Sequence, residues 1–230
     1  MFETIIKYRE IDSTNTESFR IADKINENSF VVIAEKQTAG KGRNLHKWFS
    51  PERENIYTSF VVKDSPLSIF DENIIATLSV IDTLKKYGIT ACIKLPNDII
   101  VDNRKIAGIL IEEKFLNQKK LLSVIGIGLN VNTNFDDIGL LKDTGISMAM
   151  VKKRKFNLNE VFNILHQKMR TNYINYNLNA LFLKWQKNLL KPVKVKININ
   201  GAIKVLKIKD ILPRGEIITS EGKFRYEDLL

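Results

Sequence analysis

Apolar and polar residues follow two patterns along the chain, which together predict a protein of mixed helix and strand. Short runs rich in Ile and Val, bounded by Gly, Pro, Asn or Asp, are typical of buried strands. Such runs predict strands at residues 4–8, 30–34, 56–62, 91–95, 98–101, 105–113 and 121–129. The two strands on either side of Asp102-Asn103 are expected to form a hairpin.

Helices are predicted where apolar residues recur three and four positions apart. One such stretch follows Thr14, whose spacing from Glu17 is that of a capping box. A second covers residues 69–87, and a third begins after Asn157, a residue type that often precedes a helix. A fourth contains Trp185, which we expect to lie in the core.

The pattern changes after residue 190, where short strands with alternating lysines follow one another. Asn200-Gly201 predicts a type I′ hairpin turn, and Pro213-Arg214-Gly215 predicts a second turn. The sequence therefore predicts an α+β fold in two parts, with a large domain at residues 1–188 and a small β-barrel domain at residues 189–230.

Composition excludes several classes of protein. Cys92 is the single cysteine of the 230 residues, so neither a disulfide framework nor a Cys-rich zinc site fits. No apolar run approaches the roughly 20 residues that a membrane-spanning helix needs. The first residues lack the apolar segment of a secretory signal peptide, so we expect a cytoplasmic protein with no membrane contact.

Positive charge is concentrated in the last third of the chain. The formal net charge is +10, and residues 151–230 hold 17 Lys and Arg against 6 Asp and Glu. Such a region attracts polyanions, but 27 of the 36 basic residues are Lys, whereas nucleic-acid readers rely mainly on Arg. The pattern is compatible with solvated strand faces, with an acidic protein partner, or with nucleic acid.

Four segments at strand ends carry residues suited to chemistry. In Gly40-Lys41-Gly42-Arg43 the glycines let backbone N–H groups approach an anion, and the side chains add positive charge. A mobile basic loop is the alternative, and the spacing is not that of a Walker A loop. In Lys94-Leu95-Pro96-Asn97-Asp98 the Asp could hold Mg²⁺ or fix a Lys, or the segment could be a plain turn.

The other two segments lie within predicted strands. Lys105 opens an apolar strand beside Ala107 and Gly108, where it could meet a carboxylate or phosphate, or could protect a sheet edge. The glycines of Gly126-Ile127-Gly128 predict the close approach of another backbone or of a ligand, and Asn130 could read a base edge. The two histidines lie far apart, so no His-based metal cluster or Ser/His/Asp triad is expected.

In this order and at these intervals, the segments resemble the catalytic domain of biotin protein ligases, also called biotin–[acetyl-CoA-carboxylase] synthetases. The matching stretches are Asp12 to Asn15, Gln37 to Arg43 running into Lys47 to Pro51, Lys94 to Asp98, Arg104 to Ile111, and Gly126 to Asn130. The resemblance implies a mixed sheet related to class II aminoacyl-tRNA synthetases, followed by a small SH3-like β-barrel. It leaves no room for the N-terminal helix-turn-helix of repressor-type members, so we expect no DNA-binding domain.

The resemblance also implies a two-step reaction. Biotin and Mg·ATP would form biotinyl-5′-AMP and pyrophosphate, and a lysine of an acceptor would then displace AMP. The implied acceptor is a protein such as the biotin carboxyl carrier domain of acetyl-CoA carboxylase. The sequence does not decide whether the chain forms a homodimer.

Site residues are carried over from the family by position. Lys105 and Arg43 are the expected catalytic residues, and Asp98 is the expected Mg²⁺ contact. The expected biotin contacts are Ser13, Thr14, Asn15, Gln37, Gly40, Lys41, Gly42, Arg43 and Lys105. The expected ATP and adenylate contacts are Trp48, Lys94, Asn97, Asp98 and Asn130.

The chain departs from the family loop, which usually reads G-R-G-R-x-G-R. Lys41, Leu45 and His46 replace its first Arg, third Gly and last Arg. Because Lys offers a point charge where Arg offers a fork, we hypothesise that the loop holds the adenylate less tightly. Two alternatives stay open: a lipoate or octanoate ligase, which shares the fold, and a nucleic-acid-binding module using the basic region.

Overall fold

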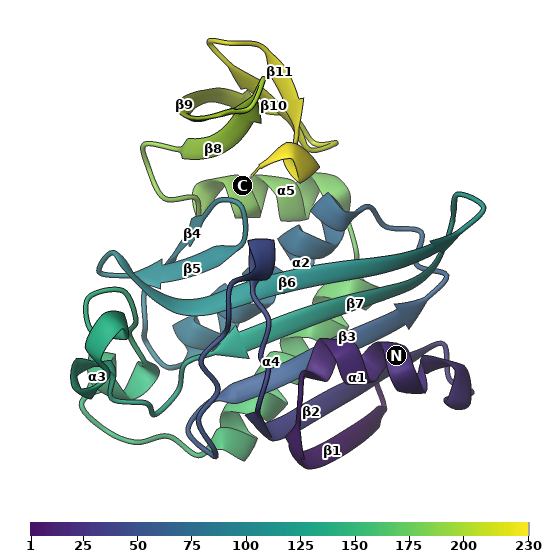
Figure 1. Cartoon of the computed structure of the whole chain (residues 1–230), viewed down its shortest axis with the longest axis vertical. Helices are drawn as coiled ribbons and strands as arrows, with labels where there is room; N and C mark the ends of the chain where they lie inside the picture. The colour runs from purple at the N-terminus through teal and green to yellow at the C-terminus, as the bar shows by residue number, and fades with distance from the viewer. Residues whose placement is uncertain (230) are drawn as a thin grey trace.

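The computed structural model describes residues 1–229 and all of their side chains except that of Leu45. A seven-stranded sheet forms the larger part of the molecule, in the order β1-β2-β3-β7-β6-β5-β4 (Figure 1). Its strands are β1 (Thr4–Ile11), β2 (Ser29–Gln37), β3 (Ile56–Lys63), β4 (Cys92–Lys94), β5 (Asp98–Val101), β6 (Arg104–Leu116) and β7 (Lys119–Leu129). β1 and β2 are parallel and the other neighbours are antiparallel, so the predicted mixed sheet is confirmed.

Helices cover both faces of this sheet because its central strands are apolar on both sides. One core joins one face of the sheet to α2 (Ile69–Lys86), α4 (Leu158–Ile174) and α5 (Leu178–Lys187). A smaller core on the opposite face joins it to α1 (Thr14–Ile21) and the short 3₁₀ turn that follows. Neighbouring residues of β2 show the division, since Phe30 and Val32 belong to the smaller core and Val31 to the larger one.

Of two N-terminal caps predicted for helices, the structure confirms one and contradicts the other. Asn157 caps α4 as predicted, its side chain accepting hydrogen bonds from Asn159 N and Glu160 N. The capping box predicted at Thr14 is wrong, because Ser13 occupies the N-cap position and makes no side-chain cap bond. The Glu17 carboxylate instead accepts from the Tyr8 hydroxyl at 2.9 Å. The short helix α3 (Met148–Lys152) was not predicted.

The C-terminal strands form a separate four-stranded antiparallel sheet in the order β11-β10-β9-β8, drawn in yellow-green in Figure 1. They are β8 (Lys194–Ile199), β9 (Ala202–Ile211), β10 (Glu216–Thr219) and β11 (Lys223–Arg225). Asn200 and Gly201 both have positive φ, as the predicted type I′ turn requires. The expected α+β fold with a small C-terminal β unit is confirmed. The boundary at residue 188 stays a prediction, since one apolar core includes both Trp185 and residues of the small sheet such as Ile217.

Within residues 1–229, no helix is both long and apolar enough to cross a bilayer. Cys92 is half-buried and forms no disulfide.

Candidate functional site

Two adjoining cavities lie where α1, the loop after β2 and the glycine-bearing strands β6 and β7 meet. The first cavity encloses about 460 Å³ between atoms, counting its open mouth, and the second about 880 Å³. Lys105 and Trp48 line both of them. Of the expected biotin contacts, the first cavity includes Ser13, Thr14, Asn15, Gln37, Lys41, Gly42, Arg43 and Lys105. Of the expected nucleotide contacts, the second cavity includes Trp48, Lys94, Asp98 and Asn130. Asn97 does not line this cavity.

One end of the first cavity is a cluster of hydroxyl and amide groups. Gln37 Oε1 accepts from Thr14 N at 2.8 Å and from Thr14 Oγ1 at 3.2 Å. Gln37 Nε2 donates to Ser50 Oγ at 3.0 Å. Ser13 lines the same cavity, is only 2% exposed as a residue, and its side chain makes no bond to the start of α1. A hydroxyl in a cavity wall is suited to bind a polar group of a ligand.

Asn15 forms a fixed part of the cavity wall. Its Nδ2 donates to Leu110 O at 3.2 Å and to the Glu112 carboxylate at 2.8 Å, and its Oδ1 accepts from Ser59 Oγ at 2.6 Å. A Cβ on Gly126 would lie 2.3 Å from that Oδ1, so a glycine is needed there. These bonds hold the amide in place and use most of its hydrogen-bonding capacity.

Trp48 packs directly on two strand glycines. An added Cβ would lie 2.9 Å from the indole at Gly108 and 2.4 Å from it at Gly128. The sequence predicted the approach of a backbone or a ligand at Gly126 and Gly128, and at Gly128 the structure shows the side chain of Trp48. The buried Trp48 Nε1 has no partner among the described residues. The ring therefore divides the two cavities and keeps an unused donor there.

Lys105 lies at the junction of the cavities. Its Nζ is 2.5 Å from Asp98 Oδ1 on the neighbouring strand β5 and 5.0 Å from the centroid of the Trp48 ring. The lysine backbone is held by Asn130, whose Nδ2 donates to Lys105 O and to Ile146 O, each at 3.1 Å. Asn130 lines the second cavity, but its side-chain donor is directed at the backbone that carries Lys105.

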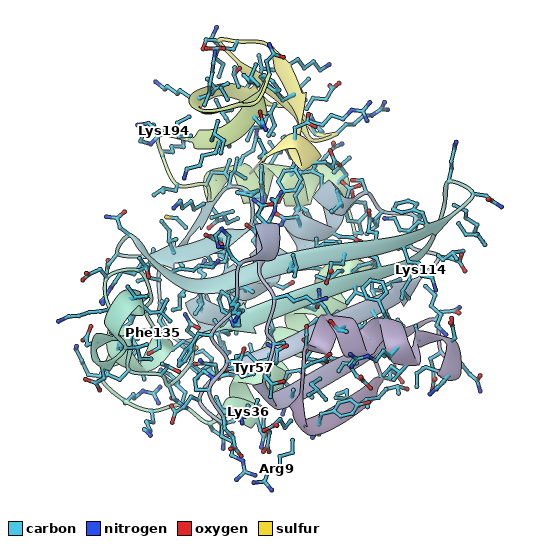
Figure 2. The ribbon with its side chains drawn as sticks, in the orientation of Figure 1. Arg9, Lys36, Tyr57, Lys114, Phe135 and Lys194 are labelled. Atoms are coloured by element: carbon cyan, nitrogen blue, oxygen red, sulfur yellow. The ribbon has the colours of Figure 1, made fainter. Side chains whose placement is uncertain are left out.

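The second cavity has a wall that the sequence did not indicate. Phe135, Asp143 and Thr144 come from the segment between β7 and α3, which has no periodic pattern. Figure 2 shows Phe135 next to α3, and a Cβ on Gly145 would lie 2.5 Å from its ring. That glycine was the only signal in the sequence that could have pointed to this wall.

Asn97 faces the first cavity, where its Nδ2 donates to Ile109 O. Tyr57 lines the same cavity and donates its hydroxyl to Pro51 O at 2.9 Å. Burial raises the pKa of Tyr57 well above its ordinary value, so this side chain stays neutral.

The basic loop lies across the mouth of the first cavity. Gly42 N donates to His46 O at 2.7 Å, and Lys41 and Lys47 form an isolated bridge. A Cβ on Gly40 would lie 2.6 Å from Trp48 O, so Gly40 supports the loop without lining the cavity. The Arg43 guanidinium donates to Leu229 O at 2.6 Å and so links the loop to the C-terminal unit. The side chain of Leu45 lies outside the described part of the structure.

Comparison with known proteins bears on what such a site does. A sequence model of the Biotin/lipoate A/B protein ligase family matches residues 8–130, more than half of the chain. The Bifunctional ligase/repressor BirA of Bacillus spizizenii is 30% identical over 193 residues, which cover 81% of this chain and 59% of that protein. The Biotin--[acetyl-CoA-carboxylase] ligase of Paracoccus denitrificans is 31% identical over 129 residues, which cover 52% of this chain and 51% of that protein. The chain thus spans only about half to three fifths of these relatives.

Solved structures share the fold over almost their whole length. The biotin protein ligase from Aquifex aeolicus in complex with biotin and ATP matches with a TM-score of 0.79 and 23% identity, over 97% of this chain and 95% of that one. The biotin protein ligase from Leishmania major in complex with biotinyl-5-AMP matches with a TM-score of 0.73 and 18% identity, over 100% and 99%. With the match to residues 8–130, these findings show that the chain belongs to the Biotin/lipoate A/B protein ligase family.

Proposed function

We propose that this chain is an ATP-dependent, AMP-forming biotin–protein ligase. It would join biotin to ATP as biotinyl-5′-AMP and then transfer biotin to a lysine of an acceptor protein, such as the biotin carboxyl carrier domain of acetyl-CoA carboxylase. The relatives named above as ligases support this assignment. We place the reaction in the cytoplasm, where the half-buried Cys92 would remain reduced.

The observation that carries the proposal is the position of Lys105 between two cavities of different chemistry. A carboxylate can attack a phosphate only if the repulsion between the two anions is offset. A fixed ammonium at the junction does this without any nucleophile from the protein. Asp98 and Asn130 hold the ammonium and its backbone in place, so little reorganisation is needed.

The two cavities suggest a division of roles. Ser13, Thr14 and Gln37 would bind the ureido group of biotin at the polar end of the first cavity, in walls fixed by Asn15 and Gly126. Lys41, Gly42 and Arg43 would close over the biotin carboxylate. Trp48, Lys94 and Asn130 would border the nucleotide in the second cavity, and Asn97 would support the first cavity wall.

Magnesium bound to ATP usually keeps several waters and takes one or two protein carboxylates besides the phosphates. Asp98 fits this need, since it lines the second cavity and only its Oδ1 is engaged by Lys105 among the described residues. No cluster of three potential metal ligands is present within residues 1–229, which is consistent with a metal that arrives with the nucleotide. When bound there, Mg²⁺ would neutralise phosphate charge.

The family also includes ligases for lipoate, which is the second candidate substrate. A dithiolane ring offers no strong donor or acceptor to the polar side chains of Ser13, Thr14 and Gln37 in the cavity wall. The ureido group of biotin offers both, so biotin fits better.

Pyrophosphate release tests the assignment directly. The protein is incubated with Mg·ATP and either biotin or lipoate, and bound products are identified by mass spectrometry. We expect pyrophosphate and a retained biotinyl-adenylate with biotin alone. Release with lipoate and not with biotin would assign the second candidate.

A further inference from the structure

The outer side of the β8–β9 hairpin is a basic and apolar face that the proposed active site does not use. Alternation along the two strands places Lys194 and Lys196 of β8 on the same side as Ile203, Val205 and Lys207 of β9, and all five are exposed. We call these five residues the lysine face. Figure 2 shows Lys194 on β8 at the side of the small sheet.

Repulsion between two residues of the lysine face lowers the stability of the β8–β9 hairpin. Lys194 lies directly opposite Lys207 in the antiparallel register, and like charges in that position repel each other. Among the described residues, none of its three lysines has a carboxylate within salt-bridge distance. By contrast, Lys204 on the other side of β9 pairs with Glu221 at 2.6 Å, and Lys223 of β11 pairs with Glu216.

Two exposed aliphatic residues lie among these cations. Ile203 is 67% exposed and Val205 is 61% exposed, and Val205 lies directly opposite Lys196. A protein partner could bury the two aliphatic side chains, while the lysines around them would lie at the polar rim of the interface and attract opposite charges on the partner. A nucleic-acid surface would instead favour Arg and polar groups. Of the three interpretations of the basic region that the sequence left open, we therefore favour an acidic protein partner for this face.

The lysine face lies close to the second cavity. Ile93 of β4 donates to Asn188 O and accepts from Leu190 N, each at 2.8 Å, and the next residue of β4, Lys94, lines that cavity. Lys194 follows Leu190 by four residues, which can span at most about 14 Å. A typical protein partner covers roughly 800 Å² of surface, so one docked over the second cavity would reach the lysine face.

We propose that the lysine face docks an acidic surface of the acceptor protein while the acceptor lysine reaches the second cavity. This inference rests on the proposed function and adds to it a docking surface outside the active site. It assigns to the lysine face a role in the transfer step alone, and the separate bond from Arg43 to Leu229 O is not part of it.

The test measures the two steps of the reaction separately. The triple variant Lys194→Gln, Lys196→Gln, Lys207→Gln is compared with the wild type and with a control that loses three exposed lysines elsewhere: Lys24→Gln, Lys85→Gln, Lys86→Gln. Adenylation is followed by biotin-dependent exchange of pyrophosphate into ATP. Transfer is followed to a purified biotin carboxyl carrier domain, and also to hydroxylamine, a nucleophile too small to dock.

For the triple variant we expect a KM for the carrier domain raised about tenfold at low salt, with exchange and transfer to hydroxylamine unchanged. Salt should raise the wild-type KM toward that of the variant, and the control should match the wild type. The inference is overturned if the KM of the triple variant stays at the wild-type value, or if the variant loses only binding to duplex DNA. Absence of biotin-dependent exchange in the wild type would instead overturn the proposed function, and the docking role with it.

Discussion

Gly128→Ala is the substitution whose effect can be worked out most directly from the site. The new methyl carbon would lie 2.4 Å from Trp48 Cε2, whereas carbon atoms in contact are about 3.5–4.0 Å apart, so the indole must retreat by roughly 1 Å. Overpacking of this kind costs about 1–3 kcal/mol of folding stability. The displaced ring would intrude on both cavities and on Lys105, and a misplacement of about 1 Å can slow a reaction about 100-fold.

The assay is biotin-dependent pyrophosphate exchange, with tryptophan fluorescence as the structural readout. Trp48 and Trp185 are the two tryptophans, and Trp185 is fully buried beside Phe70, so a changed spectrum would report on Trp48. Gly139→Ala is the matched control, because an added Cβ there meets nothing within 4 Å. We expect a large loss of exchange in Gly128→Ala and none in the control. Equal rates and equal spectra in the two variants would refute the assigned role of Trp48.

Three further predictions concern a buried carboxyl group and two residues that line the cavities. Burial raises the pKa of Glu72 from 4.5, so the folded state binds its proton more tightly than the unfolded state, and stability falls as pH rises from about 4.5 through the folded pKa. Denaturant unfolding should therefore show an advantage of Glu72→Gln that grows as pH rises from about 4.5 through the folded pKa, and a difference that stays constant over this rise would contradict this. Gln37→Leu removes the acceptor for Thr14 and should raise the KM for biotin roughly 10- to 100-fold, with the KM for ATP unchanged. Steady-state kinetics measure both values, and equal changes in the two would argue against a biotin cavity. Asn130→Leu removes one of the two donors to the carbonyl of Lys105, which keeps its bond from Ile146 N at 3.1 Å, and also removes the side-chain donor to Ile146 O. It should lower kcat about tenfold with the circular dichroism spectrum retained; an unchanged kcat would exclude a positioning role.

Local chemistry made the elements of the fold predictable. Alternation and turn residues identify the hairpin around Asp102-Asn103 and the one around Asn200-Gly201, where all four residues have positive φ. The order of strands in the large sheet could not be predicted in the same way. β3 pairs with β7, which begins more than 50 residues later in the chain, and nothing in either strand specifies that partner.

In the candidate site, too, features of a single segment could be predicted, whereas contacts between residues far apart in the chain could not. Glycines inside strands indicated close approach, but only the fold shows that Gly126 accommodates Asn15 and that Gly128 accommodates Trp48. The bond from Asn15 to Glu112 joins residues 97 positions apart. The wall around Phe135 stayed hidden because an irregular loop has no period from which its neighbours could be inferred.

The central claim is that Lys105, held between the two cavities, offsets the charge of two anions while they are joined. Single-turnover formation of biotinyl-5′-AMP by Lys105→Met, in parallel with the wild type, tests this most directly. Removal of one fixed charge-stabilising group should slow adenylate formation about 100- to 1,000-fold, with biotin still bound. Adenylate formation at the wild-type rate would contradict the account.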